Sequence, residues 1–336
     1  MTTASKPVET ATKAKPALRL VSTQGMNRDE WLSVRRQGIG SSDAAAAVGL
    51  NPYKSALELW LEKTGQDAEL PKPDPDDETS PMYWGTLLEP IVAAHYTKRT
   101  GNRVRRVNAV LQHHQHPWML ANLDREVVGS GDVQILECKT AGMNGAKLWR
   151  EGVPEYVQIQ VQHQLAVTGK QAADVAALIC GNELKVYRIN RDEELIERLI
   201  AREAEFWSLV ESGTAPAADG SESAGHALRA LWPKDAGTTL DFSGDLEHNG
   251  LFSHYLDARL ALEGAEQREA ELKQRIQQLM GDASKAVFEQ GEVSWKRSQD
   301  GQAVDTARLL KDRPASLEAY VVKRAGSRRF TVSARP

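Results

Sequence analysis

The feature that most constrains the fold is a series of strand-like segments followed by a helix-like one. Three segments rich in apolar and β-branched side chains lie at residues 104–111, 119–128 and 132–139. The Gly129-Ser130-Gly131 triplet is typical of a turn, so the last two segments are predicted to pair as a hairpin. Residues 155–167 alternate with period two in part, but their length and the flanking Pro154 and Gly169 favour a helix. This mixture predicts an α/β fold.

Changes in composition divide the 336 residues into four parts. Residues 1–24 are expected to be a disordered leader, and residues 211–225, rich in Ser, Gly, Ala and Pro, a linker. Residues 25–210 form the expected main domain. Residues 226–336 form an accessory region, with a long helix over 257–281 whose heptads look too irregular for a coiled coil. A small β-hairpin is expected near a turn at Gln290-Gly291, with short strands at 293–296 and 330–332.

Composition excludes several classes of protein. No stretch approaches the ~18 apolar residues that a membrane-spanning helix needs, and nothing resembles an export signal, so a cytoplasmic protein is expected. Two cysteines are too few for a four-cysteine zinc site or iron–sulfur cluster. The segment His113-His114-Gln115-His116 lacks a fourth zinc ligand at a known spacing and favours an exposed loop. A formal net charge of -4 argues against a nonspecific polycation, but not against DNA binding through local basic clusters.

Three residues of the predicted hairpin could form a metal site. Glu137 and Lys139 lie two residues apart, so they project from the same face of a strand. Folding the hairpin about Ser130 places Asp124 opposite Leu136, beside Glu137. Two such carboxylates suit Mg²⁺ or Mn²⁺, which can activate water against a phosphodiester. A salt-bridged Glu–Lys pair on an exposed strand is the alternative, because spacing alone does not choose between them.

Five ordered motifs across residues 28–180 carry a resemblance. They are Arg35-Arg-Gln-Gly-Ile-Gly-Ser-Ser-Asp43-Ala, Trp84-Gly-Thr-Leu-Leu-Glu89-Pro, Asn122-Leu-Asp124-Arg, Leu136-Glu-Cys-Lys139-Thr, and Tyr156 with Gln160-Val-Gln-His-Gln-Leu-Ala-Val-Thr-Gly169. Together they resemble the YqaJ-type viral recombinase family, relatives of the phage lambda exonuclease in the PD-(D/E)XK nuclease superfamily. The resemblance implies a restriction-endonuclease-like core, a central mixed β-sheet flanked by helices, and Mg²⁺-dependent degradation of double-stranded DNA from its 5′ ends.

The resemblance also implies roles for residues in the metal site. Asp124 and Glu137 match the metal ligands, with the backbone carbonyl of Cys138 as a third, and Lys139 matches the catalytic lysine. Three further assignments follow the same motifs: Glu89, on a predicted helix over 84–100, as an acid that supports the metal directly or through water, Gln160 as the glutamine after the hairpin, and Gln162 as a weaker candidate. Asp132 is a lesser rival of Asp124. The Cys138 side chain is expected to face the packed side, and His163 to be a structural helix residue.

A second set of residues is implied to bind DNA. Arg36 and Ser42 match the arginine and serine that hold a terminal 5′-phosphate, since arginine offers phosphate a bidentate fork. Ser41 and Asp43 are secondary candidates, although Asp43 can equally be the N-cap of a helix over 44–48. Weaker backbone contacts are expected from Arg35, Arg103 and Arg105.

The expected function is a Mg²⁺-dependent 5′→3′ double-strand DNA exonuclease of phage-type homologous recombination, in which Mn²⁺ substitutes for Mg²⁺. Its expected partners are double-stranded DNA ends, a single-strand annealing protein that takes the 3′ tails, and further copies of the chain, a trimer by resemblance. No zinc, iron–sulfur cluster or membrane is expected. Two alternatives remain: an endonuclease or nickase on the same metal site, and a noncatalytic DNA-end binding factor.

Overall fold

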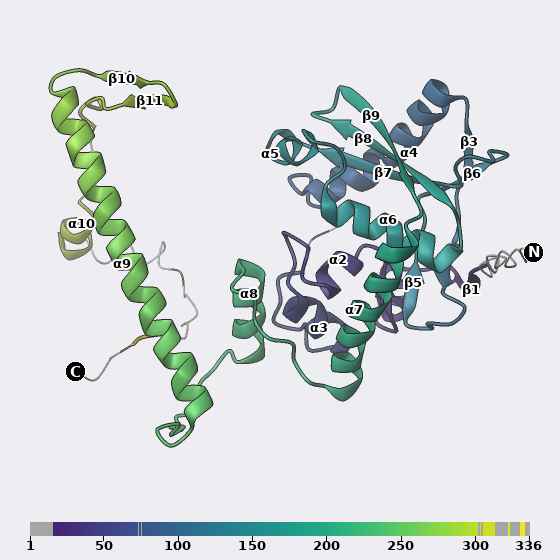
Figure 1. Ribbon diagram of the computed structural model, residues 1–336, viewed down its shortest axis with the longest axis horizontal. Coiled ribbons are helices and arrows are strands. Elements are labelled where there is room, and N and C mark those ends of the chain that lie inside the picture. Colours follow the sequence, from purple (N-terminus) through teal and green to yellow (C-terminus); the bar gives the residue numbers. More distant parts are fainter. Residues whose placement is uncertain are drawn as a thin grey trace, which may run out of the picture. The chain divides into compact units, whose positions relative to one another are not determined.

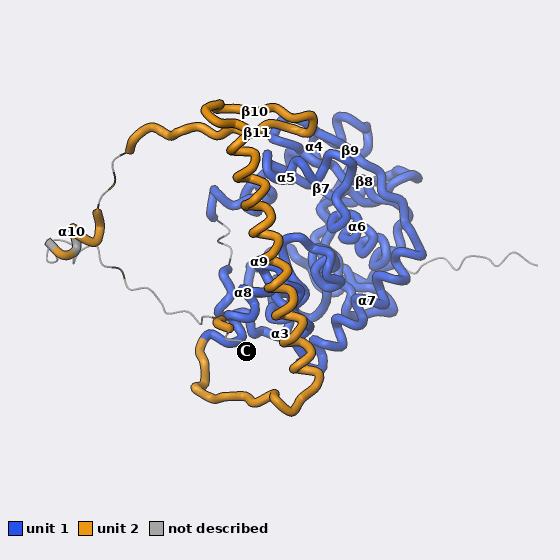
Figure 2. Tube along the Cα trace, turned by 60° about the vertical axis from the view of Figure 1, so that its left-hand side comes forward, with its two compact units in different colours: residues 1–233 blue, residues 234–336 orange. Residues whose placement is uncertain are grey.

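The computed structural model describes residues 16–72, 74, 76–301, 303, 305–312, 322 and 330–332. The chain divides into two compact units, residues 1–233 and 234–336 (Figure 2). The division falls after helix α8 (Glu222–Leu231), later than the linker expected at 211–225. Helix α8 is part of unit 1. Ser221 caps this helix, its residues Ala224 and Ala227 are buried, and it packs on α3 (Ala56–Thr64).

Unit 1 alternates short helices and strands. Its elements, besides α3 and α8, are β1 (Leu18–Ser22), α1 (Arg28–Arg35), β2 (Ile39–Gly40), α2 (Ala44–Ala47), α4 (Pro81–Thr100), β3 (Arg103–Arg105), β4 (Ala109–Gln112), β5 (Met119–Ala121), β6 (Arg125–Val128), β7 (Ile135–Ala141), α5 (Met143–Ala146), the 3₁₀ turn η1 (Lys147–Trp149), α6 (Glu155–Thr168), β8 (Ala172–Ile179), β9 (Glu183–Asn190) and α7 (Glu193–Ser212). The predicted helices over 84–100 and 155–167 are confirmed as α4 and α6.

The central sheet has five strands in the order β3-β6-β7-β8-β9 (Figure 1). Strand β7 runs parallel to β8, and the other pairs are antiparallel, so the sheet is mixed. Side chains alternate between the two faces of a strand. Leu136 of β7 packs on one side with α4, whereas Ile135 packs on the other with α6. This confirms the expected α/β core, a mixed sheet with helices on both faces.

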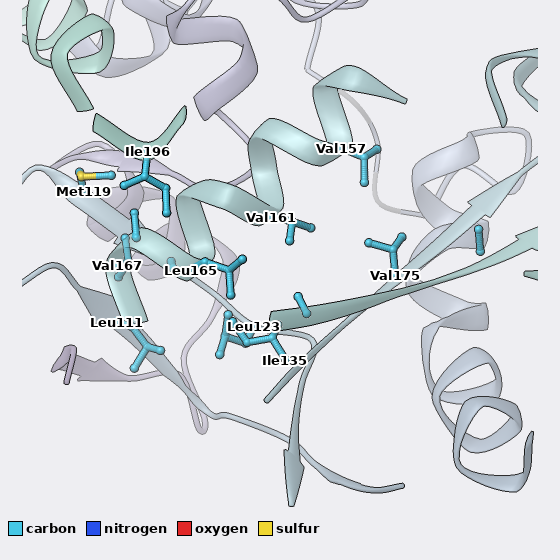
Figure 3. Packing of buried hydrophobic residues seen from close by; sticks show 14 of the residues in the cluster. Leu111, Met119, Leu123, Ile135, Val157, Val161, Leu165, Val167, Val175 and Ile196 are labelled. Carbon is cyan, nitrogen blue, oxygen red and sulfur yellow. The ribbon is translucent and has the colours of Figure 1, made fainter. Parts of the chain in front are cut away.

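The larger core cluster lies between α6 and the sheet. Val157, Val161 and Leu165 of α6 point toward Ile135 and Val175 of the sheet (Figure 3). Their spacing of four residues puts them on one helical face. Burying an aliphatic side chain of this size stabilises a fold by roughly 1.5–3 kcal/mol, so this face holds α6 firmly over β7.

Two of the predicted strands are each split between two sheets. The second sheet, in the order β1-β4-β5-β2, takes β4 from segment 104–111 and β5 from segment 119–128. The chain then crosses to the central sheet through residues 122–124, which leaves Asp124 just before β6. Residues 18–22, expected in a disordered leader, form β1, because they pair antiparallel with β4. Residues 1–15 lie outside the described residues.

The hairpin register differs by one residue from the expected one. Arg125, and not Asp124, lies opposite Leu136, because the connection from Gly129 to Gln134 is wider than a tight turn about Ser130. The amide of Val127 donates to the carbonyl of Gln134, and Gly129 adopts a positive φ of 76°. Asp124, which directly precedes β6, therefore lies beside Glu137 of β7.

Unit 2 consists of the long helix α9 (Leu246–Met280), the hairpin β10 (Lys285–Phe288) and β11 (Gly291–Ser294), and α10 (Thr306–Asp312). Helix α9 begins earlier than predicted, because the Asp245 side chain caps it at the amides of Glu247 and His248. The strand expected at 330–332 is wrong, since these residues have no regular structure. The helical and small β accessory region is confirmed.

Among the described helices, none combines the length and apolar character needed to cross a membrane.

Candidate active site

Strand β7 places two chemically active side chains beside each other. Glu137 is buried, and Lys139 lies two residues further along on the same face of the strand. The Lys139 Nζ donates to Glu137 Oε1 over 2.7 Å. Burial opposes the charged form of Lys139, but the Glu137 charge and hydrogen bond outweigh it, so the pKa of Lys139 is raised. The lysine is therefore a fixed cation at this site.

Helix α6 supplies two glutamines to the same carboxylate. Gln160 Nε2 donates to Glu137 Oε1 over 2.6 Å, and Gln160 Oε1 accepts from Lys139 Nζ over 2.9 Å. Gln164, one turn further along α6, donates from Nε2 to Glu137 Oε2 over 2.8 Å. Each oxygen of Glu137 thus has a fixed amide donor, which sets the orientation of the carboxylate. The sequence motifs single out Gln160 but not Gln164, although the spacing of four residues puts both on one helical face.

Asp124 joins this group from the end of the crossing between the sheets. Its Oδ2 accepts a hydrogen bond from the backbone amide of Cys138 over 2.8 Å. Burial, and then the charge of Glu137, raise the pKa of Asp124 to about 8. Asp124 therefore meets Glu137 in a setting with too little positive charge for Asp124 to ionise easily.

Glu89 of α4 lies at the edge of the group. Its carboxylate pairs with Arg125, which also donates to the backbone carbonyl of Asp124. Within the described part of the chain, no three His, Cys, Asp or Glu side chains are arranged to hold one metal ion. The site thus offers the two carboxylates of Asp124 and Glu137, while Glu89 acts on it through Arg125.

The donor set suits a hard divalent cation. Carboxylate and carbonyl oxygens are the ligands that Mg²⁺ prefers, and Mg²⁺ commonly keeps several waters beside one or two carboxylates. A cation would also offset the charge repulsion that raises the pKa of Asp124. The Cys138 side chain packs in the core cluster on the α4 side, and burial raises the pKa of its thiol. The candidate metal ligand of Cys138 is therefore its backbone carbonyl and not its thiol.

A second polar group surrounds the end of α1. Arg35 Nη2 donates to Ser42 Oγ over 2.9 Å, pairs with Asp43, and lies over the ring of Trp31 at 4.7 Å. Asp43 is buried and accepts from Lys63 Nζ over 2.7 Å. Burial opposes ionisation of Asp43, but Arg35 and Lys63 hold its pKa well below its usual range. These contacts hold the Arg35 guanidinium beside the exposed hydroxyl of Ser42.

Several residues predicted to bind DNA are buried or paired with other side chains. Arg36, expected beside Ser42, turns to Asp67 instead, with Nη2 3.1 Å from Oδ1. Asp43 occupies the N-cap position of α2, as the alternative expected, but its side chain makes no capping hydrogen bond there. Ser41 is buried, and Arg105 of the edge strand β3 is paired with Glu126. Arg103 is exposed on the same strand.

The minor candidates have structural surroundings. Asp132 lies exposed in the β6–β7 connection, five residues before Glu137, and its carbonyl accepts from Arg188. The Gln162 side chain spans Asn190 and Asp192, away from Glu137. His163 is buried between Glu203 and the carbonyl of Leu120, which confirms a structural role. His113 accepts from the amides of Gln115 and His116, as in a local loop.

Comparison with known proteins identifies the family. Residues 30–171 match the YqaJ-like viral recombinase domain. An uncharacterized protein YqaJ from Bacillus subtilis is 36% identical over 324 residues, which cover 95% of this chain and 98% of the relative. The chain therefore belongs to the YqaJ family, as the sequence motifs indicated.

Solved structures of lower identity also resemble this chain. An alkaline exonuclease from Laribacter hongkongensis has 23% identity and a TM-score of 0.44, over 55% of this chain and 94% of that one. A phage-related exonuclease from Haemophilus somnus has 12% identity and a TM-score of 0.39, over 54% of this chain and 97% of that one.

Proposed function

We propose that this protein is a Mg²⁺-dependent 5′→3′ exonuclease that degrades double-stranded DNA. The observation that carries the proposal is the meeting of Asp124, Glu137 and Lys139, with Gln160, on one face of β7. Membership of a viral recombinase family supports a role in DNA processing. A bound Mg²⁺ would supply an activated water and stabilise the leaving oxygen, and Mn²⁺ would substitute for it.

Asp124, Glu137 and the Cys138 carbonyl would hold the ion, and Glu89 would support them through Arg125. The two glutamines keep the Glu137 carboxylate oriented before any ion binds. Lys139 stays charged next to the reacting phosphate, where its ammonium would stabilise the negative charge that develops in the transition state. Water would attack the phosphorus, and the P–O3′ bond would break.

Arg35 and Ser42 are proposed to bind the terminal 5′-phosphate, in place of the Arg36–Ser42 pair expected from the sequence. Arg35 is the arginine whose Nη2 reaches Ser42 Oγ. Breaking the P–O3′ bond leaves a phosphate on the 5′ end of the next nucleotide, so each cut would regenerate the group that this pair recognises. Ser41, Arg103 and Arg105 would have at most backbone-binding roles.

The product of this activity would be duplex DNA with 3′ single-stranded tails. Such tails are the substrate of a single-strand annealing protein, which we propose as the functional partner. A ring of several copies, a trimer by resemblance, would keep the enzyme on its DNA. We propose that these steps take place in the cytoplasm of a bacterial or phage-infected cell.

The test uses linear duplex DNA with either 5′-phosphate or 5′-hydroxyl ends, beside covalently closed circles, in Mg²⁺. Wild type should release nucleotides from the 5′-phosphorylated ends and leave circles intact, and Lys139→Ala should be inactive. Lys185→Ala is the matched control, because Lys185 forms the same Glu-x-Lys ion pair with Glu183 on β9, the edge strand of the same sheet. This control should keep wild-type activity.

Other results would replace the proposal. Cutting of closed circles would favour an endonuclease or nickase on the same metal site. Tight binding to duplex ends with no nucleotide release in Mg²⁺ or Mn²⁺ would favour a noncatalytic end-binding factor. Equal loss in Lys139→Ala and Lys185→Ala would remove the β7 site from the mechanism.

A further inference from the structure

Helix α9 carries a regular apolar stripe along one of its faces. Starting at Leu251, steps of four and three residues run along one face of the helix to Leu279. The nine positions of this stripe are Leu251, Tyr255, Ala258, Leu262, Ala265, Glu269, Leu272, Ile276 and Leu279. Eight of the nine are apolar, in the spacing of the core positions of a coiled coil. Further leucines of α9, such as Leu260, lie off the stripe.

The stripe needs a partner. Met280 is the one buried residue of α9 among the residues that the structure describes, and Leu262 of the stripe is 59% exposed. Helical stability in water comes mainly from packing an apolar face, so a 35-residue helix with such a face favours a covered state. A groove of about 980 Å³ also opens along the stripe, between Leu272 and Ile276 of the helix and Trp295 beyond β11.

Charges beside the stripe restrict what can cover it. In a parallel pair of α9 helices, Arg268 of one copy would face Lys273 of the other, and the two Glu269 carboxylates would meet in the core. Like charges in these positions oppose pairing, and a carboxylate buried against another is strongly unfavourable. A parallel pair is therefore excluded.

An antiparallel pair removes these conflicts. With Leu262 opposite Ala265 of the second copy, the stripe positions of the two helices meet in pairs, and Leu251 faces Ile276 of the second copy. Tyr255 then faces Leu272 of the second copy, and Glu269 faces Ala258 of the second copy instead of another carboxylate. In the same register, Arg259 flanks Glu266 of the second copy, twice by symmetry. The overlap runs over residues 248–279, about 48 Å of helix at ~1.5 Å per residue.

From this complementarity we infer that the α9 stripe is the docking surface for α9 of a second copy of this chain, in antiparallel orientation. The pairing is independent of the nuclease proposal. It adds an interface outside the nuclease unit, and it would join two copies, or two rings of copies, through their C-terminal units.

The first test is the mass of the full-length chain in solution, measured by sedimentation at several concentrations. Leu262→Glu, within the stripe, should halve the mass of the assembly. Leu260→Glu is the matched control, because Leu260 lies two residues away on the same helix, off the stripe, and is 70% exposed. It should leave the mass unchanged. Equal masses for wild type and Leu262→Glu would overturn the inference, as would equal loss in both variants.

The second test addresses orientation by charge exchange. Arg259→Glu and Glu266→Arg should each raise the dissociation constant of the pair by about tenfold, since each brings like charges together twice. An equimolar mixture of the two variants should pair as tightly as wild type, because every contact is again Arg with Glu. Within one helix these residues are seven apart, and Arg259 pairs locally with Glu263. Loss of a local pair would not be repaired by mixing.

Two other occupants would show different results. Tyr255 of the stripe contacts the ring of Phe330, so residues near the C-terminus of the same chain are one competitor. If these residues cover the stripe within one chain, Leu262→Glu should leave the mass of the wild-type assembly unchanged. An acidic amphipathic helix of another protein is the other competitor, given the basic flanks of the stripe. Binding of an acidic helical peptide to a chain whose own mass Leu262→Glu leaves unchanged would favour it and overturn the inference.

Discussion

The backbone amide of Cys138 donates a hydrogen bond to Asp124 Oδ2 over 2.8 Å. This bond fastens the carboxylate that ends the crossing between the two sheets to the strand that carries Glu137. It holds two acids together although burial and mutual repulsion raise the pKa of Asp124 to about 8. A site kept in this state has a strong tendency to take up either a proton or a cation.

Binding of a divalent ion should therefore release a proton from Asp124. We expect Mg²⁺ affinity to rise between about pH 6 and pH 8, with up to about one proton released per ion, because ion and proton compete for the same carboxylate. Calorimetry in buffers of different ionisation enthalpy measures the release. Asp124→Asn should abolish it, while Asp132→Asn, in the exposed connection, should not. Normal proton release in Asp124→Asn would assign the ion to other ligands.

The same raised pKa predicts how stability depends on pH without metal. Asp124 has a pKa of about 8 in the folded chain and ~3.9 in the unfolded one, so the folded state binds its proton more tightly. Stability is then lost as the pH rises from about 4 to about 8. Asn cannot ionise, so Asp124→Asn should melt several degrees higher than wild type at pH 9 in EDTA, with no difference below pH 4. Equal melting temperatures at pH 9 would contradict the prediction.

The two neighbouring arginines at the end of α1 should differ sharply in function. Arg35 reaches Ser42, whereas Arg36 is engaged with Asp67. We expect Arg35→Ala to remove the preference for 5′-phosphorylated over 5′-hydroxyl ends, a loss of about 10- to 100-fold in kcat/KM on phosphorylated DNA. Arg36→Ala should change it less than about threefold. The reverse pattern would restore the assignment expected from the sequence.

Gln164 should matter for catalysis through Glu137. Gln164→Leu removes the donor to Glu137 Oε2, so we expect activity or metal affinity to fall about 10- to 100-fold. Gln162→Leu is the matched control, because Gln162 lies on the same helix but bonds to Asn190 and Asp192. That variant should cost roughly 1–3 kcal/mol of unfolding free energy and leave kcat unchanged. Equal kcat values in both variants would limit Gln164 to a structural role.

The sequence predicts the central elements because their signals are local. Helix α6 is marked by its flanking Pro154 and Gly169, and the shared face of Glu137 and Lys139 follows from strand geometry alone. The hairpin register was off by one residue, since the width of the connection after Gly129 depends on packing of Val133 in the core.

Other features depend on contacts that no local pattern encodes. Arg35 and Arg36 are equivalent in sequence, and only the positions of Asp43 and Asp67 decide which one meets Ser42. The stripe on α9 gains Leu251 and Tyr255 because the helix begins at Leu246, 11 residues before the predicted start at residue 257.

The parallel pairing of β7 with β8 has a consequence for folding kinetics. Asp124 and Glu137 come together by closing one short hairpin, an event of about 1–10 μs. Gln160 and Gln164 reach the carboxylate only after the crossover through α6 brings β8 alongside β7, and parallel pairing of this kind is intrinsically slow. A chain stalled before that step holds two acids without their amide donors. Activity should therefore recover later in refolding than hairpin structure does.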